Sequence, residues 1–281
     1  MREINVSELS DAVCKLFIDA NYYIPEDVAG SLKKALERET SETAKEILKI
    51  ILKNHDISAS EKMPLCQDTG VAVLFMEIGQ DVHFSGGDFE KAIAEGVRKG
   101  YSEGYLRKSM VGDPVMERKN TGDNNPPVLH IKIVPGENVK MTAAPKGGGS
   151  ENMSEVRMMK AADGTKGIID FAVDRVKRSG GNPCPPVIVG IGIGGDFEQS
   201  AILAKKALLR RFGERNADQK YAELEIEILK KINELGIGAM GFGGETTALE
   251  VFIEHVPCHI ASMPVAININ CHAARHKEII L

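Results

Sequence analysis

Few cysteines, no long apolar run and no basic excess mark this sequence, and each absence excludes a class of protein. The 281 residues include five cysteines, and none forms the close Cys-x-x-Cys pair that is typical of closed structural zinc sites. No apolar run approaches the roughly 18 residues of a membrane span. The first residues also lack the basic-then-apolar pattern of a signal peptide. We therefore expect a cytoplasmic protein, outside the membrane, whose thiols are free or bound to metal.

The balance of charge and apolar residues indicates a folded protein that does not bind nucleic acid. The net charge is -5, whereas a nucleic-acid-binding protein normally carries a basic excess. Hydrophobic residues make up 43% of the chain, which is enough to bury a core. The length fits one large domain or two of moderate size, and there is no clear internal repeat.

The spacing of apolar residues predicts a helical N-terminal segment, residues 1–60, followed by an α/β (α+β) region over residues 61–281, and we expect the two to form one compact unit. Alternating or buried apolar runs predict strands at 71–78, 128–134, 138–143, 187–191 and 248–269. The second and third of these could pair as a hairpin across Pro135-Gly136. Helical spacing predicts helices at 6–20, from 25, from 40, and at 89–101, 153–161, 165–178, 197–211 and 219–235.

Three cysteines stand in unlike settings that suit polar chemistry. Cys66 begins the polar turn Cys66-Gln-Asp-Thr-Gly70, and Cys184 lies between two prolines that stiffen its backbone. Cys271 precedes a segment rich in histidine and arginine, whose positive charge would stabilise a thiolate. A lone cysteine is more often a small buried hydrophobic residue, so each signal is weak by itself. Three thiolates are one short of a closed site, and they could hold an iron–sulfur cluster with one iron left for substrate.

Two glycine clusters and one arginine have more than one interpretation. The segment Lys146–Asn152 could cradle a carboxylate at a helix N-terminus, or it could be a flexible loop. Gly190–Gly195 follows a predicted strand and fits the dinucleotide fingerprint, but no second strand ends in an acidic residue about 20 residues later. Nucleotide binding is therefore a minor alternative. Arg107 could clamp an anion, although a solvated helix end is the more ordinary interpretation.

Taken together, these segments resemble the iron–sulfur hydro-lyases of the class I fumarase and L-tartrate dehydratase family, and in particular their alpha subunit. Any one of them would be a weak signal, but they follow a single order along most of the chain. The matching segments are Cys66–Gly70, Asn120–Gly122, Lys146–Asn152, Gly181–Cys184, Gly190–Gly195 and Cys271–Ala273.

The resemblance implies a cofactor and a set of roles. Cys66, Cys184 and Cys271 would hold a [4Fe-4S] cluster, while Cys14 and Cys258 fall outside the motifs. The substrate would be contacted by Gln67, Arg107 and the amides of Gly148 and Gly149. Asp68, placed near His259, would donate the proton to the leaving hydroxyl group. The implied reaction adds or removes water on a small dicarboxylate, first of all fumarate to (S)-malate, with L-tartrate dehydration as the alternative.

A dicarboxylate needs several cations, and the motifs offer only Arg107, Lys146 and Arg275. The sequence stops ten residues after Cys271, whereas single-chain members of the family continue into a second domain. We therefore expect a separate beta subunit that closes the pocket and carries the catalytic base, assembled as a dimer of alpha–beta pairs. A non-catalytic iron–sulfur protein for electron transfer or sensing is an alternative, but it leaves the polar residues after Cys66 unexplained.

Overall fold

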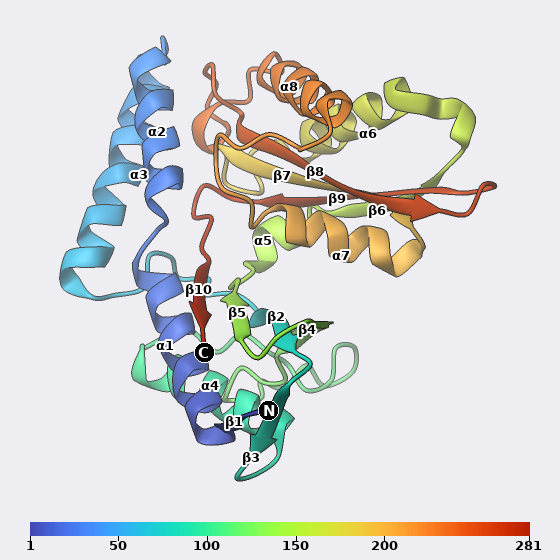
Figure 1. The fold of residues 1–281 in the computed structure, drawn as a ribbon. Helices are drawn as coiled ribbons and strands as arrows, with labels where there is room; N and C mark the ends of the chain where they lie inside the picture. The colour runs from blue at the N-terminus through green and yellow to red at the C-terminus, as the bar shows by residue number, and fades with distance from the viewer. The chain divides into compact units, whose positions relative to one another are not determined.

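The computed structural model describes residues 1–281, which form two compact units. Unit 1 contains Met1–Pro25, Asn54–Gly148 and Arg275–Leu281, and unit 2 contains Glu26–Lys53 and Gly149–Ala274. The expected mixed α/β fold with helices in its N-terminal part is confirmed (Figure 1). None of the helices combines the length and the apolar character that crossing a lipid bilayer requires.

Unit 1 is built on a four-stranded mixed sheet in the order β10-β5-β2-β4. The inner strand β2 (Val73–Gly79) runs parallel to β4 (Val128–Val134) and antiparallel to β5 (Val139–Ala143). The edge strand β10 (Lys277–Ile280) pairs antiparallel with β5. A separate two-stranded parallel sheet joins β1 (Arg2–Asn5) to β3 (Val82–Ser85).

Two helices of unit 1, α1 (Val6–Tyr22) and α4 (Phe89–Glu103), share one hydrophobic core with β2 and β5. The two helices pack closely because α4 presents glycine to α1. A Cβ atom on Gly96 would lie 2.5 Å from the main-chain oxygen of Ser10, so a larger residue would push the helices apart. This packing fixes the C-terminal end of α4, which contacts the candidate site.

Unit 2 contains a second four-stranded sheet in the order β6-β9-β7-β8. The inner strand β7 (Val187–Gly195) is parallel to β8 (Ala248–Cys258) and antiparallel to β9 (Met263–Asn270). The edge strand β6 (Glu155–Met159) is antiparallel to β9. All but the last residue of β7 are buried, as expected for an inner strand covered on both faces.

Helices cover both faces of the unit 2 sheet (Figure 1). The apolar residues at every second position of β7, starting at Val187, share a core with α6 (Gly164–Ser179) and α8 (Gln219–Asn233). The opposite face packs against α7 (Phe197–Ala207). Unit 2 also contains α2 (Glu26–Arg38) and the first part of α3 (Glu42–Glu61), while the short α5 (Gly148–Glu151) begins at the unit boundary. Two 3-10 turns, η1 (Ala161–Asp163) and η2 (Ala239–Gly241), complete it.

The glycine fingerprint of residues 190–195 has a packing role in this structure. A Cβ atom on Gly190 would lie 2.1 Å from the main-chain oxygen of Ala204, and one on Gly192 would lie 2.0 Å from that of Ser200. Glycine at both positions therefore lets α7 lie directly on β7. The following residue, Asp196, caps the N-terminus of α7 with its own carboxylate. These contacts account for the glycines without a nucleotide.

Two of the sequence predictions are wrong. Residues 153–161 were expected to be helical, but β6 occupies their centre, because pairing with β9 outweighs the modest helix preference of its Glu, Arg and Met residues. The hairpin expected across Pro135-Gly136 does not form. Strands β4 and β5 instead lie on opposite sides of β2, whose largely buried residues suit the middle of a sheet better than those of the exposed edge strand β4.

Candidate active site

The Cys66–Gly70 loop lies in unit 1 between α3 and β2. At its end Gly70 has a φ of +81°, a conformation that favours glycine. The next residue, Val71, forms an isolated antiparallel bridge with Lys146. A Cβ atom on Gly70 would lie 2.6 Å from the main-chain nitrogen of Lys146, so only glycine lets the loop run along this neighbouring segment.

Side chains outside and inside the loop hold its backbone. The buried hydroxyl group of Tyr101, near the end of α4, lies 3.0 Å from the carbonyl oxygen of Thr69 and 2.8 Å from that of Gly70. Burial raises the pKa of this phenol, which therefore keeps its proton as a donor. Asn124, also fully buried, donates to the Gly70 carbonyl at 3.2 Å. The Thr69 hydroxyl donates to the carbonyl of Arg107 at 2.9 Å.

The carboxylate of Asp68, which is half-buried, is held in one orientation by main-chain amides. Its two oxygens accept from the amide of Gly148 at 2.7 Å and from the amide of Gly70 at 3.0 Å. Gly147 leaves room for it, since a Cβ atom there would lie 3.2 Å from an Asp68 carboxylate oxygen. The main-chain carbonyl of Asp68 accepts from the guanidinium of Arg275 at 2.7 Å. A fixed carboxyl group therefore lies two residues from Cys66.

The predicted substrate contacts lie on exposed parts of the chain. Gln67 is exposed on the loop, and the side chain of Arg107 is exposed while its carbonyl anchors Thr69. Gly148 and Gly149 are exposed at the start of α5, where the amide of Gly148 donates to Asp68. Contact between these residues and a substrate stays a prediction.

In unit 2, strand register brings two of the motif cysteines to the same end of the sheet. Cys184 lies just before β7 and Cys271 directly follows β9, and Ile188 is paired with Asn270. The carbonyl of Cys184 accepts from the amide of His272 at 3.3 Å and lies 2.9 Å from the Nδ1 atom of that residue. Cys184 itself has a φ of +53°, an uncommon conformation for a residue other than glycine.

The third motif cysteine, Cys66, belongs to unit 1. All three motif cysteines are partly exposed and none forms a disulfide. No three or more His, Cys, Asp or Glu side chains are grouped in the structure as a metal site. Ligation of one cluster by Cys66, Cys184 and Cys271 therefore stays a prediction. Of the three, Cys184 and Cys271 lie at the same end of the unit 2 sheet.

The two histidines discussed for the site lie at opposite ends of the unit 2 sheet. His259 is exposed in the turn between β8 and β9, where its Nδ1 atom accepts from the amide of Ala261 at 3.1 Å. Between this turn and Cys271 runs β9, eight residues that span about 26 Å at ~3.3 Å per residue. The histidine beside Cys184 is His272. Sequence analysis did not select His272, because the register of β7 against β9 cannot be predicted from local patterns.

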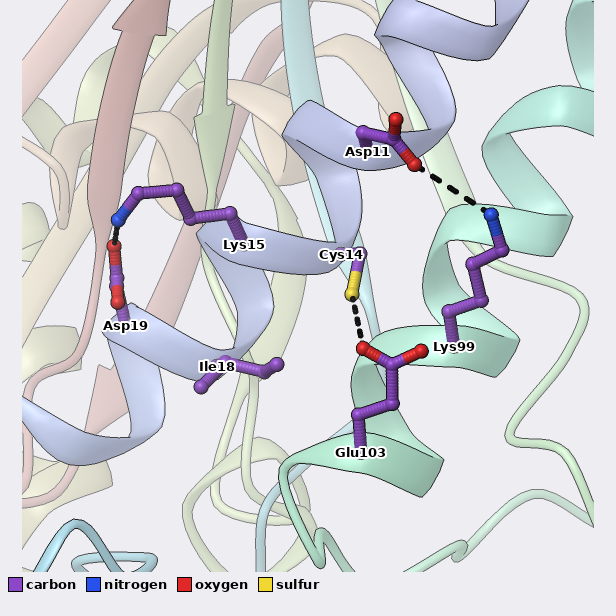
Figure 2. A pocket seen from close by; sticks show the side chains of 7 residues that line it. All are labelled: Asp11, Cys14, Lys15, Ile18, Asp19, Lys99 and Glu103. Carbon is purple, nitrogen blue, oxygen red and sulfur yellow. Dashed lines mark hydrogen bonds and ion pairs between the residues drawn. The ribbon is translucent and has the colours of Figure 1, made fainter.

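The remaining cysteines have unlike surroundings. Cys14 lies in a pocket of about 350 Å³ between α1 and α4, where its thiol contacts a Glu103 carboxylate oxygen at 3.7 Å (Figure 2). Burial, reinforced by the charge of Glu103, raises the pKa of the Cys14 thiol to about 11. A thiol that stays protonated is a poor metal ligand. Cys258 is exposed and pairs with Gly195, at the end of β7 opposite Cys184.

Comparison with known proteins identifies the family. The family model described as fumarate hydratase (fumerase) matches residues 10–280. A protein of Methanocaldococcus jannaschii, provisionally named as an L(+)-tartrate dehydratase subunit alpha, is 46% identical over 275 residues, which cover 95% of each chain. The L(+)-tartrate dehydratase subunits alpha of Escherichia coli O157:H7 and of Escherichia coli strain UTI89 are 29% and 30% identical, over 98% of this chain and 91% of theirs.

The chain therefore belongs to the fumarate hydratase family, a family of hydro-lyases. The resemblance that the six sequence segments indicated is confirmed by a match over nearly the whole chain. The relatives compared above are named as alpha subunits of L(+)-tartrate dehydratase.

Proposed function

We propose that this chain is the alpha subunit of an iron–sulfur-dependent hydro-lyase that removes water from L(+)-tartrate. The names of the relatives compared above support this substrate. Fumarate, which the family resemblance of the sequence put first, becomes the second candidate, supported by the description of the family model. The observation that carries the proposal is an Asp68 carboxyl group fixed on two amides beside Cys66, in a chain that matches alpha subunits nearly end to end.

The donor chemistry of the motif cysteines fits an iron–sulfur cluster. Thiolates select soft or borderline metals and clusters, whereas Mg²⁺ and Ca²⁺ prefer oxygen ligands. Cys184 and Cys271 lie at one sheet end, and Cys66 is partly exposed on a rigid loop. A [4Fe-4S] cluster held by these three cysteines would supply a Lewis acid for the substrate hydroxyl group.

The chain's own contribution to the reaction is a placed proton donor. Asp68 donates a proton to the leaving hydroxyl group, and general acid catalysis of this kind typically contributes about 10²- to 10⁴-fold to the rate. The amides of Gly70 and Gly148 fix the direction in which its carboxyl group points. His259 stays the proposed partner of Asp68, although its place beyond β9 separates it from the two motif cysteines of its own unit.

Binding a dicarboxylate and removing its C–H proton need groups that this chain does not place in the site. The exposed Arg107 is the one motif cation with a solvent-facing side chain, while Arg275 and Lys146 are buried. We therefore propose a beta subunit that contributes further cations and the catalytic base, in agreement with the alpha-subunit names of the relatives. A dimer of alpha–beta pairs is the proposed assembly, and its mass in solution tests it.

The proposal is tested by anaerobic purification of this chain with its candidate beta subunit, followed by parallel assays of L(+)-tartrate dehydration and fumarate hydration. We expect turnover with both subunits present, with a higher kcat/KM for tartrate. Substitution of Cys66, Cys184 or Cys271 by alanine should abolish both the visible absorbance of the cluster and the activity. Cys258→Ala is the matched control and should change neither.

The variant Asp68→Asn tests whether Asp68 acts as the proton donor without disturbing the cluster. We expect this variant to keep the cluster absorbance and to lose at least about 100-fold in kcat, because the amide cannot give up a proton. Unchanged turnover would refute the assignment of Asp68. A cluster that survives all three cysteine substitutions would refute the ligand set, and a loaded subunit pair that turns over neither substrate would support the non-catalytic alternative.

A further inference from the structure

Arg275 is a buried cation that has no acidic partner. Its side chain is 3% exposed, and it follows Cys271 by four residues in the sequence. A guanidinium group keeps its charge at all physiological pH values, so burying it is costly unless its donors are satisfied. One nitrogen donates to the side-chain oxygen of Asn21 at 3.0 Å and another to the main-chain oxygen of Asp68 at 2.7 Å. The third, Nε, has no partner.

The two acceptors of Arg275 belong to different segments of unit 1. Asn21 lies near the end of α1, where its amide nitrogen donates to the carbonyl of Phe17 at 2.9 Å. Its main-chain carbonyl accepts from the amide of Leu65, immediately before Cys66, at 2.9 Å. The guanidinium therefore joins the end of a rigid helix to the middle of the loop, and Asn21 holds the start of the same loop.

We propose that Arg275 is a positioning residue for Asp68. Given the proposed function, in which Asp68 is the proton donor, Arg275 sets the place of its main chain while the amides of Gly70 and Gly148 set the direction of its carboxyl group. Catalytic groups need to be held within about 0.5 Å of their productive place, and a displacement of about 1 Å can cost about 100-fold in rate.

The shape of the arginine side chain matters here as much as its charge. A guanidinium presents several donors in a rigid plane, so it can reach Asn21 and Asp68 at the same time. A lysine at this position would keep the charge, but its single ammonium group is not preorganised to bridge two segments. We therefore expect Arg275→Lys to rescue part of the activity that Arg275→Ala loses.

The first test measures kcat and KM of the loaded subunit pair for Arg275→Ala and Arg275→Lys. We expect Arg275→Ala to lower kcat by about 10- to 100-fold while KM changes by less than about twofold, because the residue acts on Asp68 and not on substrate binding. Arg2→Ala is the matched control, since Arg2 also donates to a main-chain carbonyl and to an asparagine side chain, those of Glu137 and Asn138, both within unit 1. Its kcat should equal that of the wild type.

A double-mutant cycle distinguishes positioning from general support of the fold. In the Asp68→Asn background the loss of Arg275 should cost less than about twofold in the residual rate, because there is no longer an acid to position. An equal cost in both backgrounds would overturn the proposal. The proposal would also be overturned if Arg275→Ala kept full activity, or if its loss of activity were no larger than its loss of folded protein.

Hydrogen exchange supplies a readout that does not depend on activity. In the full-length chain, Arg275→Ala should speed amide exchange in residues 66–70 and leave β7 unchanged, and Arg275→Lys should have a smaller effect. If the wild type turns over neither tartrate nor fumarate, the proposed function fails while this result still stands. If the loop stays protected in Arg275→Ala, the positioning role fails whatever the substrate is.

Discussion

At the residue scale, Gly70 shows how a single hydrogen atom in place of a side chain shapes the candidate site. Its φ of +81° is shared with Gly122, which also lies in unit 1. The two differ in their surroundings, because a Cβ atom on Gly70 would meet the backbone of Lys146 while one on Gly122 would meet nothing within 4 Å. Alanine substitution at the two positions can therefore separate two destabilising effects, the positive φ angle and the overlap with the Lys146 backbone.

We predict that Gly122→Ala lowers the free energy of unfolding by about 1 kcal/mol, the cost of the left-handed conformation alone. Gly70→Ala should lower it by at least about 2 kcal/mol more, because its neighbour is main chain that cannot rotate away. Urea unfolding followed by circular dichroism at 222 nm measures both. Equal losses in the two variants would show that the contact with Lys146 is unimportant.

The thiol of Cys14 gives a second prediction at this scale. With its pKa raised to about 11, chiefly by burial and then by Glu103, about one molecule in a thousand carries the thiolate at pH 8. We expect alkylation of Cys14 by iodoacetamide to be slow at pH 8 and to rise about tenfold per pH unit up to pH 10, because the thiolate is the reactive form. Peptide mass spectrometry measures this rate separately from that of Cys258.

Glu103→Gln is the informative variant for Cys14, since it removes the charge that opposes the thiolate but leaves the burial. The alkylation rate at pH 8 should rise severalfold while staying below that of the exposed Cys258. Rapid alkylation of Cys14 in the wild type at pH 8 would contradict the raised pKa.

At the scale of elements, the contact between β7 and α7 is set by glycine. We predict that Gly192→Ala lowers the free energy of unfolding by at least about 3 kcal/mol, because its methyl group would overlap the backbone of α7. Gly30→Ala, in α2, should instead stabilise by about 0.5 to 1 kcal/mol, since nothing lies within 4 Å of its Cβ position. Thermal unfolding compares the two, and a mild effect of Gly192→Ala would mean that α7 can shift away.

The sequence predicted most elements because their patterns are local. Apolar spacing located α1, α4 and α8, and the short apolar run from Val187 located β7. The errors arose where long-range pairing decides the outcome. Residues 155–159 become a strand only because β9, more than a hundred residues later, offers them an edge. Likewise β2 lies between β4 and β5 in the sheet. The residues around Pro135-Gly136 contain no pattern that predicts this order.

The candidate site shows the same division between local and long-range information. The chemical character of Asp68 and of the motif cysteines could be read from the sequence around each of them. The partners of Asp68 could not, because Gly148 and Arg275 lie 80 and 207 residues away. The pairing of His272 with Cys184 depends on the register of two strands in the same way.

At the scale of the whole molecule, unit 1 is assembled from three separate stretches of chain. The last of them supplies both β10 and Arg275. We predict that deleting residues 275–281 speeds amide hydrogen exchange in β5 and in residues 66–70, because β5 loses a neighbour and Asp68 loses a hydrogen bond. Exchange in β7 and β9, which belong to unit 2, should not change.

Glu278→Gln is the control for that deletion. It alters an exposed ion pair with Lys140 but keeps β10 and Arg275 in place, so it should leave exchange in both units as it is in the wild type. If amide exchange in β5 and in residues 66–70 is as slow after the deletion as in the wild type, the C-terminal stretch does not stabilise unit 1.

The interrupted layout of unit 1 has a consequence for how the protein is made. β5 leaves the ribosome long before the strand that completes its sheet edge, and residues 149–274 are synthesised in between. At typical rates of about 5 to 20 residues per second, that delay is on the order of ten seconds. During this interval the Asp68 loop is without its guanidinium anchor. Unit 2 also waits, because its inner strand β9 is synthesised only at the end of that interval, so the segment from β9 to β10 completes both units.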